Sequence, residues 1–312
     1  MQNSYFIVDL QGTGHPTACG FAQCIVGPRS GSCSMSREGR VRVAGHEDGF
    51  SALRERLRAG ETLLGTFVQL PHPVVVESLA PTVGLDFLCL EAEHSAMGEE
   101  TVQAMIAAAD GTGTPMLVRV EDNAWVPVAR ALDGGAAGVI APRVNNAAEA
   151  RALVGAARYP PDGDRGIGPG RATAYGSNSG PDYRAGANQH VLIGAQVETR
   201  RALDDLDGIL AVPGIDLIFV GPMDLASSLG LTPGSPELNA VIEDVVSRAR
   251  AAGRAVGIFA VTAEQVAHWV GRGVQVILFG SDLIFMGAGL TAALKACRDV
   301  GATTAAGKRG AS

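Results

Sequence analysis

The chain has 312 residues, of which 46% are hydrophobic and 18% charged, and its formal net charge is -7. This length suffices for one large domain or two small ones with a sizeable core. With no basic tract and no apolar stretch near the roughly 20 residues that cross a bilayer, neither nucleic acid nor a membrane is expected as a partner. Five cysteines, without the pattern of a signal peptide, favour reduced thiols in the cytoplasm.

Lysine usage excludes one class of chemistry. The only lysines are Lys295 and Lys308, and every other of the 25 basic residues is an arginine. Enzymes that form a Schiff base need a desolvated lysine inside the site. Lys295 lies in the last helical pattern and Lys308 in a tail rich in Gly, Ala and Ser. We therefore expect neither a Schiff-base lysine nor pyridoxal phosphate (PLP).

Residues 1–46 differ from the rest of the chain, being rich in Gly and Ser. Three cysteines and two histidines occur there: His15, Cys19, Cys24, Cys33 and His46. The spacing contains no close cysteine pair of the kind that zinc sites use. We interpret this segment as an N-terminal extension that is poorly ordered or accessory.

From Gly49 onward, after a short amphipathic helix that Gly60 ends, apolar runs alternate with helical patterns. The predicted strands are 63–68, 86–90, 115–120, 137–142, 191–198, 216–220, 255–260 and 275–280. The predicted helices between and after them are 74–80, 99–110, 124–133, 146–157, 200–211, 236–252, 263–271 and 285–298.

Eight strands, each followed by a helix, predict an α/β fold with a parallel sheet closed into a (β/α)8 TIM barrel over residues 47–298, with 299–312 as a flexible tail. The alternative is a doubly wound open sheet, which usually has fewer strands and needs a glycine-rich first turn. The GTG at 12–14 opens no helix, so no nicotinamide cofactor is expected. One connection, 159–189, is long enough to predict a lid or a subunit-contact loop.

The working groups of such barrels lie where strands end, in the loops that follow. Polar residues collect at these positions of the predicted strands. They are Glu91, Glu93 and His94 after the second strand, Arg119 at the third, Gln196 and Glu198 at the fifth, Asp224 after the sixth, and Ser281 and Asp282 after the eighth.

Glu198 and Asp224 form the natural metal pair, because both are hard oxygen donors at the ends of neighbouring strands. Two carboxylates leave open positions on an octahedral Mg²⁺ or Mn²⁺ for water and a chelating substrate. Gln196 lies two residues before Glu198, so both side chains face the same side of the strand. The alternative is a pair of solvated loop carboxylates.

Two further groups are candidates for catalysis. Arg119 ends an apolar run and would clamp a substrate carboxylate or an enolate oxygen, or else form a structural ion pair with Glu93 or Asp133. His94, beside acidic groups, would be a general base or an ordinary hydrogen-bonded loop histidine.

Two loop segments could contact the substrate. The amides of Gly221 to Asp224, a stretch that includes Pro222 and Met223, precede a short helical turn and could hold a carboxylate. His72, after the first strand, is a weaker candidate for a substrate contact.

The motifs LEAEH (90–94), LVRV (117–120), LDGGAAGVIAPRVNNAAEA (132–150), RYPPDGDRG (158–166), QVET (196–199) and FVGPMDL (219–225) resemble the HpcH/HpaI aldolase family. This is the family of metal-dependent class II pyruvate aldolases, such as 4-hydroxy-2-oxoheptanedioate aldolase. The resemblance covers residues from about Gly65 to Ala296. One position departs from it, since the family usually has Asp where this chain has Glu91.

The resemblance implies a barrel of the phosphoenolpyruvate/pyruvate-binding type, whose last helix packs on a neighbouring subunit in a cytoplasmic homohexamer built as a trimer of dimers. It implies a divalent metal (Mg²⁺, Mn²⁺ or Co²⁺) held by Glu198 and Asp224 and chelated by pyruvate. Arg119 would stabilise the enolate, and His94 would move the proton with an acidic partner. Glu91 and Asp133 match acidic positions of the family's site.

The expected activity is that of a metal-dependent lyase, which makes or breaks a carbon–carbon bond of a 4-hydroxy-2-oxo acid through a pyruvate enolate, with an aldehyde as the second partner. A close alternative is oxaloacetate decarboxylation, or another reaction that begins from its enolate. An alternative of another class is a protein that binds pyruvate or oxalate without turnover.

Overall fold

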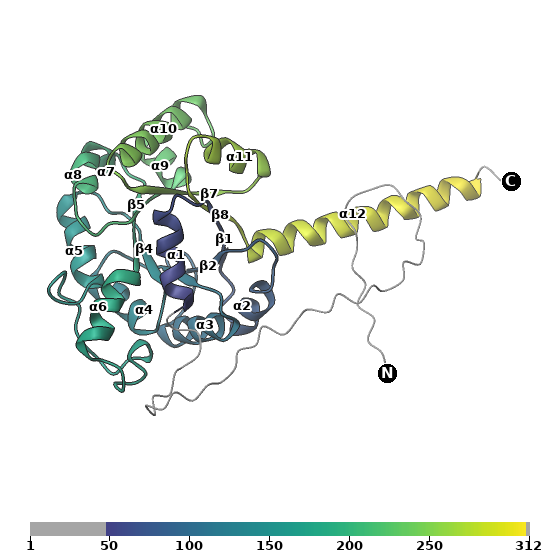
Figure 1. The fold of residues 1–312 in the computed structure, drawn as a ribbon. Helices are drawn as coiled ribbons and strands as arrows, with labels where there is room; N and C mark the ends of the chain where they lie inside the picture. The colour runs from purple at the N-terminus through teal and green to yellow at the C-terminus, as the bar shows by residue number, and fades with distance from the viewer. Residues whose placement is uncertain (1–47, 310–312) are drawn as a thin grey trace. The chain divides into compact units, whose positions relative to one another are not determined.

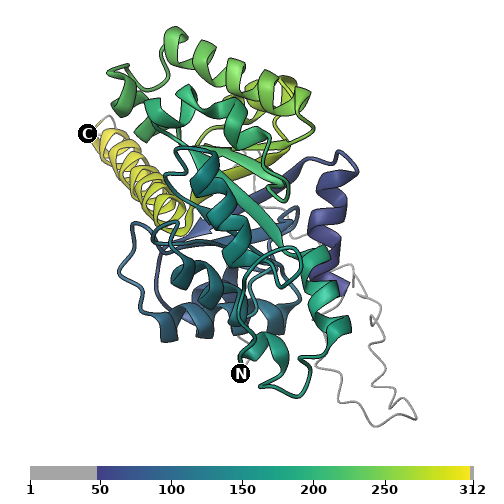
Figure 2. The ribbon, with the colours of Figure 1, turned by 90° about the vertical axis from the view of Figure 1, so that its left-hand side faces the viewer.

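The computed structural model describes residues 48–309, with side chains over 53–298, so the expectations for residues 1–46 lie outside the described part. The strands β1 to β8 form one closed parallel barrel in chain order, with the helices around it (Figures 1 and 2). The predicted (β/α)8 barrel is confirmed, and the open doubly wound sheet is excluded.

The strands coincide closely with the predicted apolar runs. Nearly every strand residue is buried, as expected for strands covered by side chains on the inside and by helices on the outside. The strand bounds are β1 Leu63–Val68, β2 Phe87–Glu91, β3 Met116–Arg119, β4 Gly138–Ala141, β5 Leu192–Val197, β6 Leu217–Val220, β7 Ala255–Ala260 and β8 Val276–Ser281.

The predicted helices are also present, and the structure adds α6, the 3₁₀ turn η1 and α9. The helix bounds are α1 Asp48–Arg58, α2 Pro73–Leu79, α3 Glu99–Thr112, α4 Trp125–Asp133, α5 Ala147–Ala157, η1 Arg171–Thr173, α6 Pro181–His190, α7 Arg200–Asp204, α8 Leu206–Leu210, α9 Pro222–Leu229, α10 Pro236–Ala251, α11 Ala263–Gly271 and α12 Asp282–Arg309.

Helix α1 lies across the N-terminal end of the barrel (Figure 1). Its Leu53 and Leu57 belong to one buried cluster with the residues that begin the strands, such as Leu63 and Leu217. The opposite end, where the strands finish, is therefore the end available for a site.

The long connection between α5 and β5 lies on the same N-terminal side. Arg165 pairs with Asp133 at the end of α4, Arg171 pairs with Asp110 near the end of α3, and α6 contacts α1. Of the two predicted roles of this connection, a lid over the site is wrong, and a subunit-contact loop stays a prediction. A connection from the end of a helix to the start of a strand must lie at the N-terminal end of the barrel.

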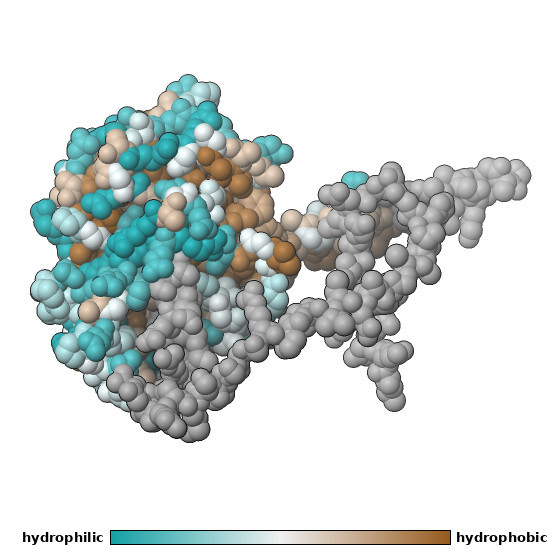
Figure 3. All heavy atoms as spheres, viewed as in Figure 1, coloured by the Kyte–Doolittle hydropathy of each residue, from teal (hydrophilic) through white to brown (hydrophobic). Residues whose placement is uncertain are grey.

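Helix α12 (yellow in Figure 1) begins directly after β8 and continues to Arg309, past the predicted end at residue 298, through an Ala-containing stretch without proline. Its first turns contact β1 and β8. Figure 3 shows hydrophobic surface where it begins, and the exposed apolar side chains there include Met286, Leu290 and Leu294. Among residues 48–309, no helix is long and apolar enough to span a bilayer.

Candidate active site

Glu198 is the centre of the site. It follows β5 directly and is only 2% exposed. Its Oε1 accepts the backbone N–H of Arg143 at 2.9 Å, and its Oε2 accepts Nε2 of Gln196. Burial raises the pKa of the Glu198 carboxyl, and these two hydrogen bonds oppose that effect.

Gly221, which follows β6 and precedes α9, leaves the space that Glu198 occupies. A Cβ at this position would lie 2.7 Å from Oε2 of Glu198 and 3.2 Å from its Cβ. Pro222 and exposed Met223 begin α9, and Asp224 lies in its first turn. The nearby negative charge of Asp224 further raises the pKa of Glu198.

These residues fit a hard divalent cation. The two carboxylates come from the ends of neighbouring strands, and the buried Oε1 of Gln196 has no hydrogen-bond partner within the described part of the chain. Mg²⁺ is commonly bound by one or two carboxylates plus water and substrate oxygens. Residues 48–309 contain no group of three or more His, Cys, Asp or Glu side chains that could hold a metal without such additional ligands.

Arg119 ends β3 opposite Glu91, which ends β2. Its Nε donates to Oε2 of Glu91 at 2.6 Å, and its guanidinium lies 4.7 Å from the ring centroid of Phe67. The alternative of an ion pair with Asp133 is excluded, because Asp133 lies at the opposite end of the barrel. Arg119 and Glu198 lie at the same end of the barrel, where β3 and β5 finish, and the positive charge of Arg119 lowers the pKa of Glu198.

Glu91 does not contact the ring of His94. The carboxylate is 1% exposed, and its Oε1 accepts the backbone N–H groups of Glu93 and His94, each at 2.9 Å. With its other oxygen on Arg119, Glu91 fixes the start of the loop and the clamp together. Both carboxylate oxygens of Glu91 are thus bound elsewhere, and Glu91 is not the acidic partner of the His94 imidazole in the single chain.

The acidic neighbour of His94 is Glu93, which was expected at the strand ends and as a possible ion-pair partner of Arg119, but not as the partner of His94. The His94 side chain is 58% exposed, and its Nε2 lies 3.8 Å from Oε2 of Glu93. That oxygen is also 3.4 Å from Nη1 of Arg119, an ion-pair distance that lacks hydrogen-bond geometry. Burial raises the pKa of Glu93, and the charge of Arg119 opposes the shift. The spacing of two residues from Glu91 could have indicated that both face the same side.

Within one chain, Asp133 does not lie near Glu198, Arg119 or His94. It ends α4, and Ala137, just after it, donates its backbone N–H to Met116, the first residue of β3. Its carboxylate accepts Nη2 of Arg165 at 2.6 Å. A helix that follows a strand runs back to the N-terminal end of the barrel, so the expectation of a catalytic Asp133 is not met here.

Other candidates have structural roles. Asp282 accepts the backbone N–H groups of Gln69 and Leu70, the latter at 2.9 Å, and so ties the loop after β1 to the end of β8. The hydroxyl of Ser281 accepts the N–H of Ile284 in the first turn of α12. His72 accepts the N–H of Val74 and caps α2.

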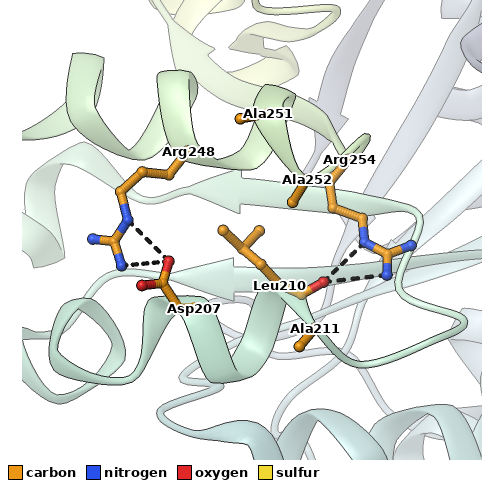
Figure 4. A pocket seen from close by; sticks show the side chains of 7 residues that line it. All are labelled: Asp207, Leu210, Ala211, Arg248, Ala251, Ala252 and Arg254. Atoms are coloured by element: carbon orange, nitrogen blue, oxygen red, sulfur yellow. Dashed lines mark hydrogen bonds and ion pairs between the residues drawn. The ribbon is translucent and has the colours of Figure 1, made fainter.

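A surface pocket of about 540 Å³ lies between α8 and α10 (Figure 4). The ion pair of Arg248 with Asp207 crosses it, and Arg254 donates to the carbonyl oxygen of Leu210. It is formed by the C-terminal ends of helices, so it lies away from Glu198 and its neighbours.

Comparison with known proteins identifies the family of this barrel. The HpcH/HpaI aldolase/citrate lyase family profile matches residues 63–286. A hydroxypyruvate/pyruvate aldolase of Roseovarius nubinhibens is 36% identical over 239 residues, which cover 76% of this chain and 92% of that protein. A 4-hydroxy-2-oxo-heptane-1,7-dioate aldolase of Salmonella dublin is 35% identical over 244 residues, 78% of this chain and 92% of that protein.

Solved structures show the same likeness. An HpcH/HpaI aldolase/citrate lyase family protein of Burkholderia cenocepacia J2315 is 34% identical, with a TM-score of 0.75, over 80% of this chain and 99% of that one. The citrate synthase SbnG is 28% identical, with a TM-score of 0.73, over 81% and 99%. The chain therefore belongs to the HpcH/HpaI aldolase/citrate lyase family and is an enzyme of the carbon–carbon lyase class.

Proposed function

We propose that the protein is a divalent-metal-dependent aldolase that cleaves or forms the carbon–carbon bond of a 4-hydroxy-2-oxo acid through a pyruvate enolate. The observation that supports this most directly is that buried Glu198 follows β5, Asp224 lies in the first turn of α9 after β6, and Arg119 ends β3, all at the C-terminal end of one closed barrel. Carboxylates that suit a hard cation and a guanidinium that suits an enolate oxygen thus share one site at the strand ends. The names of the relatives agree with this chemistry.

Glu198 and Asp224 would hold the cation, with Gln196 as the adjacent polar group. A Mg²⁺, Mn²⁺ or Co²⁺ ion there would act as a Lewis acid that polarises the keto group of the substrate. Gln196 and the backbone N–H of Arg143 keep the Glu198 carboxylate in one orientation. Ligand orientation of this kind contributes to metal affinity.

Arg119 would bind the substrate oxygen on which negative charge develops. Its Nε is committed to Glu91, so the guanidinium arrives already oriented and loses little freedom when substrate binds. Nη2 also pairs with Oε2 of Glu91, so Nη1, which lies 3.4 Å from Oε2 of Glu93, would be the nitrogen that faces the substrate. Arg119 can act in this way only while it is paired with Glu91. We therefore assign to the Glu91 carboxylate the function of orienting the guanidinium.

His94 and Glu93 would manage the proton. In the cleavage direction a base must take the proton of the 4-hydroxyl group as the carbon–carbon bond breaks. Exposed His94 can accept it, and Glu93, 3.8 Å from Nε2, would stabilise the imidazolium that forms. The exposed Met223 and the N-terminus of α9 would line the pyruvate half of the site.

The test is a coupled assay with lactate dehydrogenase that follows pyruvate release from 4-hydroxy-2-oxoheptanedioate. With Mg²⁺ or Mn²⁺ we expect turnover that EDTA abolishes, and Glu198→Gln and Asp224→Asn should lose most of it. Glu237→Gln, at an exposed position in the first turn of α10, is the matched control and should keep it. Turnover that survives chelation would contradict the metal mechanism.

Oxaloacetate is the second candidate substrate, because its decarboxylation passes through the same enolate and the citrate synthase SbnG shares this fold at 28% identity. The same assay with oxaloacetate tests it. Metal-dependent binding of pyruvate without turnover on either substrate would contradict both candidate substrates.

We further propose that α12 packs on a neighbouring copy in a homohexamer. Met286, Leu290 and Leu294 repeat at four-residue spacing, lie on one helix face and are all exposed in the single chain. Light scattering after size exclusion should give the hexamer mass, and Leu290→Glu should reduce it. A wild-type monomer would contradict the proposal.

A further inference from the structure

Arg143 holds a fixed position at the edge of the site. It follows β4, and its backbone N–H donates to Oε1 of Glu198 at 2.9 Å. Its carbonyl oxygen accepts Nδ2 of Asn145 at 2.6 Å and Nδ2 of Asn123 at 3.1 Å. Its φ is 55°, a left-handed conformation that long side chains rarely adopt. Three hydrogen bonds therefore hold a strained residue directly beside the metal-binding carboxylate.

The guanidinium of Arg143 is available for a ligand. The side chain is exposed, and across residues 53–298 it has neither an ion pair nor a hydrogen bond. The nearby carboxylate of Glu149 already accepts the backbone N–H of Asn145 at 2.7 Å and Nδ2 of Asn146 at 2.9 Å. No side chain of residues 53–298 therefore uses the charge of Arg143.

We propose that the guanidinium of Arg143 binds an anionic group at the far end of the acceptor aldehyde, so that the enzyme selects aldehydes that carry a carboxylate. This rests on the proposed aldolase function. The pyruvate half has its own partners in Arg119, the cation and the start of α9, so a second cationic group at the edge of the site suits the other half of the substrate. A planar guanidinium can hold a carboxylate through two parallel hydrogen bonds.

The names of two relatives indicate which acceptor aldehydes to compare. One is named for a heptane-1,7-dioate, whose aldehyde fragment retains a carboxylate at its far end, and another for hydroxypyruvate and pyruvate. Arg143 predicts that this chain handles the dicarboxylate type of oxo acid.

The experiment compares two acceptors in aldol addition to pyruvate: succinic semialdehyde, and butanal, which has the same chain length without the carboxylate. Arg143→Asn removes the charge with a residue that tolerates the left-handed conformation, and Arg143→Lys keeps the charge. Arg200→Ala is the matched control, because Arg200 is also an exposed arginine after a strand end, with no side-chain partner among the described residues.

We expect the wild type to prefer succinic semialdehyde by about 10- to 100-fold in kcat/KM, the range of charged hydrogen bonds. Arg143→Asn should abolish this preference mainly through the KM of the charged aldehyde, Arg143→Lys should restore part of it, and Arg200→Ala should retain it. An unchanged preference in Arg143→Asn, or an equal loss in Arg200→Ala, would overturn the assignment.

The failure of this inference is distinguishable from failure of the proposed function. A wild type that decarboxylates oxaloacetate but treats both aldehydes alike would overturn the role of Arg143 alone. A wild type inactive on oxaloacetate and on both aldehydes would overturn the aldolase proposal and this inference with it.

Discussion

Arg119 and Glu91 form a buried ion pair between neighbouring strands, with Nε of Arg119 2.6 Å from Oε2 of Glu91. The same carboxylate accepts two backbone N–H groups of the following loop through its other oxygen. These hydrogen bonds from Arg119, Glu93 and His94 offset the cost of removing the Glu91 carboxylate from water. The pair orients the clamp and fixes the position from which Glu93 and His94 extend.

Glu91→Gln is expected to lower both stability and turnover. Arg119 would keep its buried position without a full counter-charge, and removing one partner of a buried pair costs about 3–5 kcal/mol. Urea denaturation should show a loss near the lower end of that range, since the amide oxygen still accepts hydrogen bonds. The kcat for pyruvate release should fall together with stability, because the clamp loses its orientation.

The exposed pair of Glu99 with Arg130 provides the control, since their side chains are 65% and 57% exposed. Glu99→Gln should change the free energy of unfolding by less than about 1 kcal/mol and leave kcat unchanged. If both variants lose the same stability, the buried pair has no special role.

Gly221→Ala should weaken metal binding. The added Cβ would lie 2.7 Å from Oε2 of Glu198, so the carboxylate would have to move. Displacing a metal-ligand carboxylate from its oriented position is expected to cost about 10-fold or more in affinity for Mn²⁺, measured by calorimetry.

Gly98→Ala is the control for Gly221→Ala. It places a Cβ where nothing lies within 4 Å, in an extended backbone that any residue adopts, and should bind Mn²⁺ like the wild type. Equal affinity in Gly221→Ala and the wild type would show that Glu198 does not need this space.

The barrel could be predicted because its strands are buried on both faces. A run such as 87–90 (FLCL) is then continuously apolar and ends at the charged Glu91, which fixes the strand without any partner being known. The positions of Asp133 and of the 159–189 connection at the N-terminal end of the barrel could also have been predicted from the sequence. Both follow a predicted helix, and the end of such a helix lies at the N-terminal end of a barrel.

The contacts of the site could not be predicted in the same way. Glu91 ends β2 and Glu93 lies in the loop that follows. Which of them meets Arg119 most closely depends on the register of β2 with β3, where Glu91 lies opposite Arg119. A single sequence does not contain that register. The support of Glu198 by the backbone of Arg143 was hidden for a related reason, because any residue type can donate a backbone N–H.

Glu93→Gln should stabilise the metal-free protein at neutral pH. Burial raises the pKa of Glu93 above its ordinary value of 4.5, so the charged form is disfavoured in the folded state. Its stabilising contribution is complete below 4.5 and is lost as the pH rises through the raised pKa. Thermal unfolding should therefore show a gain on the order of 1 kcal/mol at pH 7 that disappears below pH 4.5.

Glu264→Gln is the control for Glu93→Gln, because the pKa of Glu264 is shifted in the opposite direction. Its pKa is lowered by its own backbone N–H and by the Thr262 side chain, so Glu264→Gln should give no gain at pH 7. A gain from Glu93→Gln that persisted at low pH would exclude an electrostatic origin.

Asp216→Asn should destabilise the N-terminal end of the barrel. Its carboxylate pairs with Arg54 of α1 at 2.6 Å and with Arg158 at 3.3 Å. Burial, together with the charge of Arg54, lowers the pKa of Arg158 to about 10, so these cations depend on the acid between them. We expect urea denaturation to show a loss of about 3–5 kcal/mol in the free energy of unfolding, and hydrogen exchange in α1 to accelerate.

Asp207→Asn is the control for Asp216→Asn. It removes an exposed partner of Arg248 and should cost less than about 1 kcal/mol. Unchanged exchange in α1 of Asp216→Asn would mean that the packing of Leu53 and Leu57, rather than the ion pair, holds this helix on the barrel.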